Sequence, residues 1–344
     1  MGARLPARPP ATLGSRGGRG VILAAVVGLL VVCAPAQAAR PALRLATWNI
    51  EHLAAADGAG CRPRTAADYA RLRGVAERLD ADIVAVQEVQ NAHALARVFD
   101  PKVYDLVVSA RRETGRDTCR GMPGQRFTAQ RTGFAINREG LRHAGLDYRV
   151  REGFRELGAD GLRWGTRILV EPIDGHGAAF ELMAIHLKAG CAYNRLDRNV
   201  RRHQCRTLIR QRGVLEEWID ARAAADIPFV VIGDFNRELD QPNDHFWTDI
   251  DDGMVCDWRP DADLGRRCRP GSERPDRDAD LVLAGAGRPF PFPRNPKYPY
   301  AIDHVVLGGA AKHWLVPGSW RAFDYGPGAE PSDHHPIAVE LRLP

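Results

Sequence analysis

The sequence predicts an α/β protein in which β-sheets pack against one another and helices lie outside them. About ten short apolar runs, rich in β-branched residues, recur along the chain as strands do. Segments with helical spacing of apolar residues lie between several of these runs. Hydrophobic residues make up 44% and charged residues 26% of the 344 residues, which is a globular composition and excludes a disordered or fibrous chain.

Residues 1–38 have the pattern of a cleavable secretory signal. Four arginines precede the apolar stretch 21–34, and Ala36-Gln37-Ala38 offers a cleavage site of small residues. An uncleaved anchor is the alternative, although this apolar stretch is short for a membrane span. We expect a secreted or periplasmic protein with a single domain over 39–344. Loss of the four arginines lowers the net charge from +5 to +1, so bulk charge does not indicate nucleic-acid binding.

The elements follow in order from these patterns. A capping-box pattern, Thr65-Ala-Ala-Asp68, opens an amphipathic helix to residue 79, and a second helix is expected over 199–224. The segment 253–300 is irregular and rich in Pro, Arg and Asp, which predicts a long loop without secondary structure. The predicted strands are 43–48, 83–86, 104–108, 133–136, 168–170, 180–185, 229–232, 281–283, 305–307 and 337–341.

Six cysteines follow the signal segment, and an even number in an exported chain favours disulfides. The pairs Cys191–Cys205 and Cys256–Cys268 would close short loops and are preferred, which leaves Cys61 and Cys119. Other connectivities stay open. No C-x-x-C occurs, which argues against a zinc ribbon or a redox dithiol.

Polar side chains stand at the ends of the apolar runs. A carboxylate beside a buried strand is costly unless it is paired, hydrogen-bonded or metal-bound, and ligand sites collect at strand ends. Several such residues together therefore predict a site. They are Asn49, Glu88, His186, Asp234, Asn236, Asp303, Asp333 and His334.

These residue types indicate a particular chemistry. Carboxylate and amide oxygens suit Mg²⁺, Mn²⁺ or Ca²⁺ better than zinc. Histidines transfer protons and stabilise charge near neutral pH, and Asp303 is suited to orient one imidazole. The sequence contains no H-E-x-x-H, no G-x-x-x-x-G-K-[ST], no G-x-G-x-x-G and no G-x-S-x-G, which excludes those metal, phosphate-loop, dinucleotide and serine-hydrolase motifs.

Six motifs, taken in order, resemble the signature of the endonuclease/exonuclease/phosphatase superfamily over 43–341. The resemblance implies a four-layer α/β sandwich, with two packed mixed β-sheets flanked by helices. It also implies hydrolysis of phosphoesters with a divalent cation, usually Mg²⁺. The motifs are Thr-Trp-Asn49-Ile-Glu51, Val-Gln-Glu88-Val, Ile-His186-Leu-Lys188, Ile-Gly-Asp234-Phe-Asn236, Ile-Asp303-His and Ser-Asp333-His334-His-Pro-Ile.

The resemblance also implies metal ligands and phosphate contacts. Glu88 would be the principal metal ligand, with Asn49 and Asp333 near it. Glu51 resembles an acid of abasic-site enzymes, so a role toward a second metal ion stays open. Arg131 and Lys188 are expected to contact substrate phosphate.

The remaining motif residues would act on the reacting groups. Asp234 would position or deprotonate the attacking water, and Asn236 would hold the phosphate. His334 would stabilise the transition state, with Asp303 as its orienting carboxylate. His186 would be an acid–base histidine. The segment 107–112 lacks the acid that pancreatic-type deoxyribonucleases pair with that histidine, so the group that orients it is left open.

Three other histidines are not expected to act. His304 and His335 adjoin motif residues, but alternation along a strand points them away, so we expect packing or surface roles. His52 has no partner that the sequence identifies and is expected to be solvated.

The leading functional hypothesis is a secreted Mg²⁺-dependent nuclease that cleaves DNA or RNA by attack of an activated water. Contacts to the nucleic-acid backbone would make cleavage largely nonspecific. The alternative is a phospholipid or sphingomyelin phosphodiesterase, for which Phe290-Pro-Phe292 or Tyr298-Pro-Tyr300 would have to form an exposed apolar loop. A catalytically silent binding protein is the third hypothesis, and the complete set of acids and histidines argues against it. No protein partner is predicted.

Overall fold

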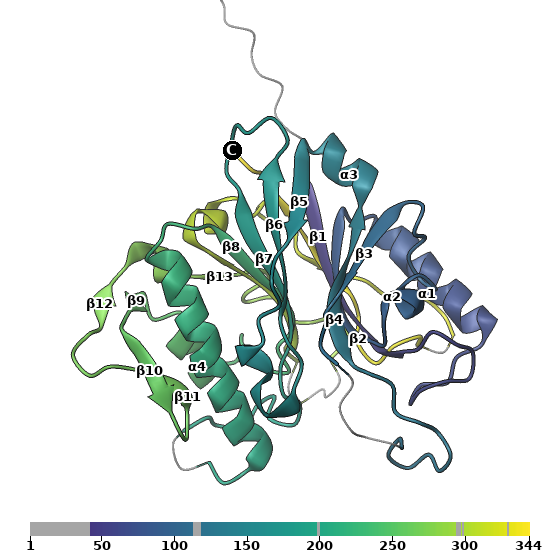
Figure 1. The fold of residues 1–344 in the computed structure, drawn as a ribbon, viewed down its shortest axis with the longest axis horizontal. Helices are drawn as coiled ribbons and strands as arrows, with labels where there is room; N and C mark the ends of the chain where they lie inside the picture. The colour runs from purple at the N-terminus through teal and green to yellow at the C-terminus, as the bar shows by residue number, and fades with distance from the viewer. Residues whose placement is uncertain (1–41, 113–117, 198–199, 294–296, 298, 329) are drawn as a thin grey trace, which may run out of the picture. The chain divides into compact units, whose positions relative to one another are not determined.

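Two mixed β-sheets, each of six strands in the described part of the chain, pack face to face (Figure 1). The computed structural model describes residues 42–112, 118–197, 200–293, 297, 299–328 and 330–344. These residues belong to one compact unit, Arg40–Pro344. The signal segment predicted for 1–38 lies outside the described residues.

The first sheet has the strand order β15-β16-β1-β2-β4-β3. Strands β1 and β2 run parallel, whereas the other neighbours in this sheet are antiparallel. Its strands are β1 (Leu43–Leu53), β2 (Ile83–Val89), β3 (Tyr104–Val108), β4 (Arg131–Asn137), β15 (Arg321–Ala322) and β16 (Ile337–Leu341).

The second sheet has the order β13-β14-β8-β7-β6-β5, with β7 and β8 parallel and the other pairs antiparallel. Its strands are β5 (Leu146–Val150), β6 (Thr166–Pro172), β7 (Phe180–His186), β8 (Phe229–Asp234), β13 (Val282–Leu283) and β14 (Asp303–Gly308).

Helices cover the outer face of each sheet, which confirms the predicted four-layer sandwich. Helices α1 (Ala66–Leu79) and α2 (Ala92–Leu95) pack on the first sheet, and α4 (His203–Ala223) and α5 (His245–Ile250) on the second. Strand β1 shows why its sequence is apolar throughout: Leu43 and Leu45 face the other sheet, whereas Ala46 and Trp48 face the helical layer. The short helix α3 (Arg138–His143) follows β4, and its Leu141 joins the core between the sheets.

The prediction that 253–300 lacks secondary structure is wrong. This segment forms two small antiparallel ribbons, one from β10 (Trp258–Asp261) and β11 (Gly265–Cys268), the other from β9 (Met254–Val255) and β12 (Arg274–Pro275). It also contains the short 3₁₀ helix η2 (Arg277–Ala279) and edge strand β13, where the predicted strand 281–283 is confirmed. Strands of two to four residues are too short to show a hydrophobic period, so the sequence pattern does not reveal them. Two further 3₁₀ helices are η1 (Glu156–Gly161) and η3 (Gly309–His313).

Three disulfides tie loops to this framework, and the preferred cysteine pairs are confirmed. Cys191–Cys205 joins the segment after β7 to α4, Cys256–Cys268 closes the β10–β11 ribbon, and Cys61 pairs with Cys119. Among the residues that the structure describes, no helix combines the length and the apolar character that crossing a membrane requires.

Candidate active site

The second sheet brings three predicted residues side by side. Strands β7 and β8 are parallel and end together, with His186 opposite Asp234 in the register. Strand β14 runs antiparallel to β8, so its first residue, Asp303, lies opposite Asp234 on the other side. Residues in register on adjacent strands project to the same face of a sheet, so this topology gathers a carboxylate, a second carboxylate and an imidazole.

The first sheet contributes an amide and a carboxylate to the same place. Asn49 Nδ2 donates a hydrogen bond to Asp234 Oδ2 at 3.0 Å and lies 3.5 Å from Glu88 Oε1. Asn49 is buried, and its Oδ1 accepts a hydrogen bond from the backbone N–H of Glu51 at 3.0 Å. The Asn49 side chain therefore joins the ends of the two sheets and fixes the position of Asp234.

The backbone is strained where these side chains project. Glu51, His52, Glu88 and Asn236 have φ values of 42°, 51°, 60° and 50°, in the left-handed region that non-glycine residues rarely adopt. The ladders of β1 and β2 are irregular at this point. Such distortions re-aim side chains at strand ends and concentrate at functional sites.

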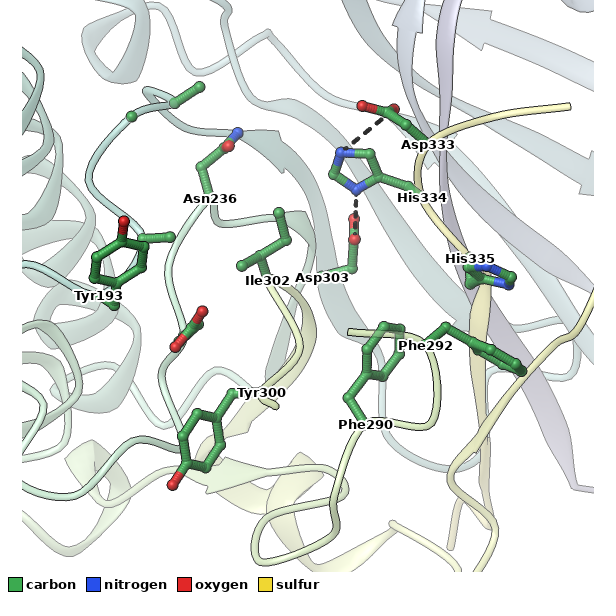
Figure 2. Close-up of a pocket in the computed structure, with 14 residues that line it drawn as sticks. Tyr193, Asn236, Phe290, Phe292, Tyr300, Ile302, Asp303, Asp333, His334 and His335 are labelled. Atoms are coloured by element: carbon green, nitrogen blue, oxygen red, sulfur yellow. Dashed lines mark hydrogen bonds and ion pairs between the residues drawn. The ribbon is translucent and has the colours of Figure 1, made fainter. Parts of the chain in front are cut away.

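His334 is held as an imidazolium. Its Nδ1 lies 2.7 Å from Asp303 Oδ2, and its Nε2 lies 3.8 Å from Asp333 Oδ1 (Figure 2). The same Nε2 lies 3.8 Å from Asp234 Oδ2. Burial opposes the charge, but Asp303 and Asp234 outweigh it and raise the pKa of His334 to about 10. The Asp303–His334 pairing that the resemblance implied is therefore present.

Asp234 and His186 form the most buried part of the cluster. Burial raises the pKa of Asp234 to about 7, against the effect of the His334 charge. His186 Nε2 lies 3.3 Å from Asp234 Oδ2, and burial together with Arg163 lowers the pKa of His186, which favours a neutral ring. Within the described chain, His186 Nδ1 has no hydrogen-bond partner. The acids next to this imidazole are thus Asp234 and Glu88, whose Oε1 lies 3.9 Å from the same Nε2 atom.

Acids that fit a divalent cation crowd beside this cluster. Glu51 Oε2 accepts a hydrogen bond from the Asp333 backbone N–H at 3.2 Å. Burial raises the pKa of Glu51, and the charges of Asp333 and Glu88 raise it further, whereas Arg62, whose Nε lies 3.5 Å from Glu51 Oε2, and Arg64 lower it. Carboxylates that repel one another, together with the Asn49 amide, form the hard-oxygen donor set that Mg²⁺ or Mn²⁺ prefers.

A second set of possible metal ligands is Asp234, Asp303 and His334, whose donor atoms lie within 4.8 Å of one another. Here the 2.7 Å contact between His334 Nδ1 and Asp303 Oδ2 already occupies one donor of each residue. The set around Glu88 therefore fits a cation better.

Arg131 and Lys188, the expected phosphate contacts, both donate hydrogen bonds to backbone carbonyls. The Arg131 guanidinium donates to the carbonyls of Gln90 and Arg111, which holds β4 against neighbouring loops. Lys188 is near His186 in sequence, and its Nζ donates to the Ala189 carbonyl at 3.2 Å. Their roles toward substrate stay predictions.

The expectation that His52 is solvated is wrong. Its backbone N–H donates to Glu88 Oε2 at 3.0 Å, its Nε2 lies 3.6 Å from the same oxygen, and its ring packs edge-on against Phe127. His304 packs as expected: it is buried, and its Nε2 lies 2.8 Å from the Arg237 carbonyl oxygen. His335 is also buried and stacks on Phe292.

Three positioning residues were missed by the sequence reasoning. The Tyr325 hydroxyl donates to the His334 carbonyl and accepts from Trp48 Nε1 at 2.8 Å. The buried Arg64 guanidinium donates to the Ile50 and Pro331 carbonyls, both at 2.8 Å, and so joins the loops that carry Glu51 and His334. Ser332 Oγ donates to the Asn49 carbonyl at 2.7 Å. Only Ser332 carried a sequence signal, because it lies inside a motif.

A cavity of about 360 Å³ opens beside the cluster. Asn236, Asp303, Asp333 and His334 line one part of it, and several aromatic side chains are among the other lining residues (Figure 2). Asn236 donates its Nδ2 hydrogen to the Leu187 carbonyl at 3.2 Å, and its backbone N–H bonds Asp234 Oδ1 at 2.7 Å. The cavity provides room for a substrate group next to the acids and imidazoles.

Two packed mixed sheets, with acids, amides and histidines at one end, define an α/β sandwich with a polar site at the strand ends. The chain belongs to the Endonuclease/Exonuclease/phosphatase family, whose model matches residues 46–334. Membership supports a phosphoester hydrolase, and enzymes of this family generally use divalent metals. No curated protein matches the chain.

Solved structures show the same fold. The human Nocturnin catalytic domain, solved with a bound sulfate anion, has a TM-score of 0.52 and 18% sequence identity, covering 89% of this chain and 96% of that chain. Truncated TDP2 from Caenorhabditis elegans has a TM-score of 0.51 and 12% identity, covering 88% and 98%. At these identities the likeness shows the fold alone.

Proposed function

We propose that this protein is a secreted, Mg²⁺-dependent nuclease that cleaves phosphodiester bonds of DNA or RNA by attack of an activated water. The observation that carries the proposal is the convergence of the buried Asp234 with Asn236 and the Asp303–His334 pair, of which the last three line the cavity. Three disulfides are compatible with an extracellular protein. Mg²⁺ held by Glu88 with Asn49, Glu51 and Asp333 would supply charge neutralisation at the phosphate.

Asp234 is the proposed base. Asn49 holds its Oδ2 at 3.0 Å and the Asn236 backbone holds its Oδ1 at 2.7 Å, so its carboxylate is fixed. A pKa of about 7, raised by burial, suits a group that accepts a proton from water near neutral pH.

His334 is the proposed stabiliser of the transition state. The Nδ1–H of His334 donates a hydrogen bond to Asp303, so the Nε2–H stays available to donate to a phosphate oxygen. The Nε2 atom lies 3.8 Å from both Asp234 and Asp333, so a phosphate oxygen there would be close to the base as well. A preorganised charge at the point where negative charge develops is a large source of catalysis.

His186 is proposed to position Asp234 rather than to protonate a leaving group. Its Nε2 is 3.3 Å from Asp234 Oδ2, and burial favours the neutral ring. A neutral imidazole whose Nε2–H points toward Asp234 donates a hydrogen bond to that carboxylate without adding a positive charge beside it. This role differs from the acid–base role implied by the sequence resemblance.

The aromatic loop favours a nucleic acid over a lipid. Phe290 is only 9% exposed and lines the cavity, and Phe292 stacks on the His335 ring at 4.0 Å. An enzyme that enters a lipid surface needs an exposed apolar segment, and these two side chains turn inward. Tyr298 lies outside the described residues. The large apolar side chains that are exposed in the described chain are scattered: Val103, Met122, Val150, Ile173 and Tyr193.

The test is incubation of the mature protein with supercoiled plasmid and, separately, with sphingomyelin, each with Mg²⁺ or EDTA. We expect nicking of the plasmid that needs Mg²⁺ and falls by at least about 100-fold in Asp234→Asn, as loss of a general base does. Asp147→Asn, an exposed change on β5, is the matched control. An intact plasmid with metal-dependent release of phosphocholine would overturn the nuclease proposal.

A further inference from the structure

A buried carboxylate lies in the cavity next to the proposed catalytic residues. Glu238 is 5% exposed and lines the same cavity as Asn236 and His334. Its Oε2 has no hydrogen-bond partner among the residues that the structure describes. A buried acceptor is costly when it is unsatisfied, so an unmet oxygen on a residue that lines a cavity indicates a place where a ligand could donate a hydrogen bond.

The loop that carries Glu238 is held firmly. The Glu238 backbone N–H donates to the Ala192 carbonyl at 3.0 Å. The neighbouring Arg237 is buried, and it donates to Asp244 Oδ2 at 2.7 Å and to the Cys191 carbonyl at 2.8 Å. The guanidinium of Arg237 is thus bonded to other groups of the loop, and Glu238 lies in a firmly held segment of the cavity wall.

The cavity walls suit a flat aromatic group. Tyr193, Tyr300 and Ile302 line it together with Phe290 and Phe292 (Figure 2). Phe292 is fixed between two rings, because it stacks on His335 and meets Phe290 edge-to-face at 6.1 Å. Pockets that bind an unpaired nucleobase combine aromatic or apolar walls with hydrogen-bonding groups for the Watson–Crick edge.

From these contacts we infer that Glu238 selects an unpaired guanine next to the scissile phosphate, by accepting hydrogen bonds from its Watson–Crick edge. This inference rests on the proposed nuclease function. Guanine presents two adjacent donors, N1–H and the N2 amino group, which match the two oxygens of a carboxylate. Adenine and cytosine offer one amino group beside a ring acceptor, and thymine has one N–H between two carbonyls, so each would place an acceptor against the carboxylate.

A choline headgroup fits these observations less well. Aromatic walls attract a quaternary ammonium, but such a cation has no N–H to give to Glu238 Oε2. A nucleobase satisfies both the walls and the unmet acceptor. The backbone contacts of a nuclease set its overall affinity, and this subsite adds a preference at one nucleotide.

The experiment measures kcat/KM for single-stranded oligothymidylates, in DNA and RNA form, that carry one central guanine, adenine, cytosine or abasic linker. It is run with Mg²⁺ at pH 8, above the pKa of about 7 to which burial raises Glu238. We expect cleavage at guanine to exceed cleavage at the other positions by about 10-fold or more, as one bidentate base contact gives. Hypoxanthine in place of guanine lacks the N2 amino group and should lose most of this preference, whereas 7-deazaguanine should keep it.

The variants Glu238→Gln and Glu238→Ala should reduce the guanine preference to within about 2-fold, since the paired acceptors are lost. Glu77→Gln, an exposed change on α1, is the matched control and should keep the wild-type ratio. Equal cleavage of all bases, a preference for another base, or a guanine preference that survives both variants overturns this inference while leaving the nuclease function standing. Failure to cleave any oligonucleotide with Mg²⁺ overturns both, as would cleavage of sphingomyelin alone. The base and analogue profiles use the wild-type protein, so the inference is tested even if a Glu238 variant does not fold.

Discussion

His334 keeps its proton because two carboxylates outweigh the cost of burying a charge. The ring is 6% exposed, with Asp303 on Nδ1 and Asp234 near Nε2. The positive charge of His334 therefore affects both the stability of the fold and the proposed catalysis. A group whose folded pKa lies above its unfolded value contributes stability that is complete below the unfolded pKa and is lost as the pH rises through the folded pKa.

The first prediction concerns the pH dependence of stability without metal. The pKa of His334 rises from 6.5 in the unfolded chain to about 10 in the fold. Between pH 7 and 10, the free energy of unfolding should therefore fall by up to about 1.4 kcal/mol per pH unit. Asp234, with a pKa of about 7, and Glu216, whose pKa burial raises to about 9, act in the same direction at lower pH, so the difference in slope between the wild type and His334→Asn isolates His334. Urea unfolding in EDTA measures the slope. The same slope in His334→Asn would contradict this account.

The second prediction concerns Tyr325→Phe. This change removes a buried hydroxyl that accepts from Trp48 Nε1 and donates to the His334 carbonyl. The partners left unsatisfied should cost about 1–3 kcal/mol of stability. We expect kcat to fall as well, since the His334 backbone loses a support.

Tyr148→Phe is the matched control, because its hydroxyl donates to Asp105 Oδ2 at 3.0 Å. Asp105 lies in register with Ile136, which is opposite the first residue of β2, at the end of that strand away from Glu88. Tyr148→Phe should lower stability without lowering kcat. Equal effects of the two changes on kcat would show that Tyr325 has no special link to the site. Denaturant unfolding and steady-state kinetics on plasmid or oligonucleotide measure the two quantities.

Among the elements, β8 has the most narrowly fixed position, because it is paired with β7 on one side and β14 on the other and ends at Asp234. Gly233 precedes this aspartate with a φ of +141°, and a Cβ there would lie 2.2 Å from the Ile185 carbonyl oxygen. Only glycine permits this close approach of β7 and β8. The strand geometry that places Asp234 beside His186 therefore depends on one missing side chain.

The third prediction follows for Gly233→Ala. The backbone of β7 would have to move, which should cost more than about 3 kcal/mol and abolish activity. Gly74→Ala in α1 is the control, because its Cβ would meet only Arg78 Nη1 at 3.9 Å and alanine favours a helix. Thermal unfolding compares the two. A Gly233→Ala protein with near-native stability would refute the proposed constraint.

The same strands show what sequence alone predicts about this fold. Strands buried on both faces, such as β1 and β8, are continuous apolar runs, so their positions and the polar residues at their ends were predictable. Strand β5 was missed because it lies at a sheet edge and is largely exposed. The contacts of Arg64, His52 and Tyr325 were also missed, because each joins segments distant in sequence and leaves no periodic signal.

For the molecule as a whole, disulfides add stability where the sandwich itself does not hold the chain. Cys191–Cys205 ties the segment with Ala192 and Tyr193, which line the cavity, to the beginning of α4. A bridge closing a loop of about 15 residues stabilises by about 3 kcal/mol in the chain-entropy account.

The fourth prediction is that replacing both Cys191 and Cys205 by serine lowers stability by roughly 2–5 kcal/mol and weakens substrate binding, raising KM more than it lowers kcat. The control removes Cys256–Cys268, which closes a loop of similar length away from the cavity and should lower stability without changing KM. Denaturant unfolding and steady-state kinetics check both. An equal change in KM after loss of either disulfide would show that the Cys191–Cys205 bridge has no particular effect on the cavity.

The last prediction concerns metal binding as a property of the whole fold. A ligand that binds only the folded state raises its stability, by about 2.7 kcal/mol at a concentration of 100 times Kd. Mg²⁺ should therefore raise the melting temperature by several degrees, and EDTA should reverse the rise. Glu88→Gln should abolish the response, because it removes a charge from the set that includes Glu51 and Asp333. Glu77→Gln, exposed on α1, should respond like the wild type.

The choice between the two ligand sets follows from the same titration. If Glu88→Gln keeps the full response and Asp303→Asn loses it, the ion binds at Asp234, Asp303 and His334 instead. We expect the opposite, because the Asp303 oxygen and the His334 Nδ1 atom are already bonded at 2.7 Å, whereas burial and the charges of Asp333 and Glu88 raise the pKa of Glu51 and so favour an added positive charge there. Melting curves need no substrate, so this measurement tests the metal site separately from the nuclease proposal.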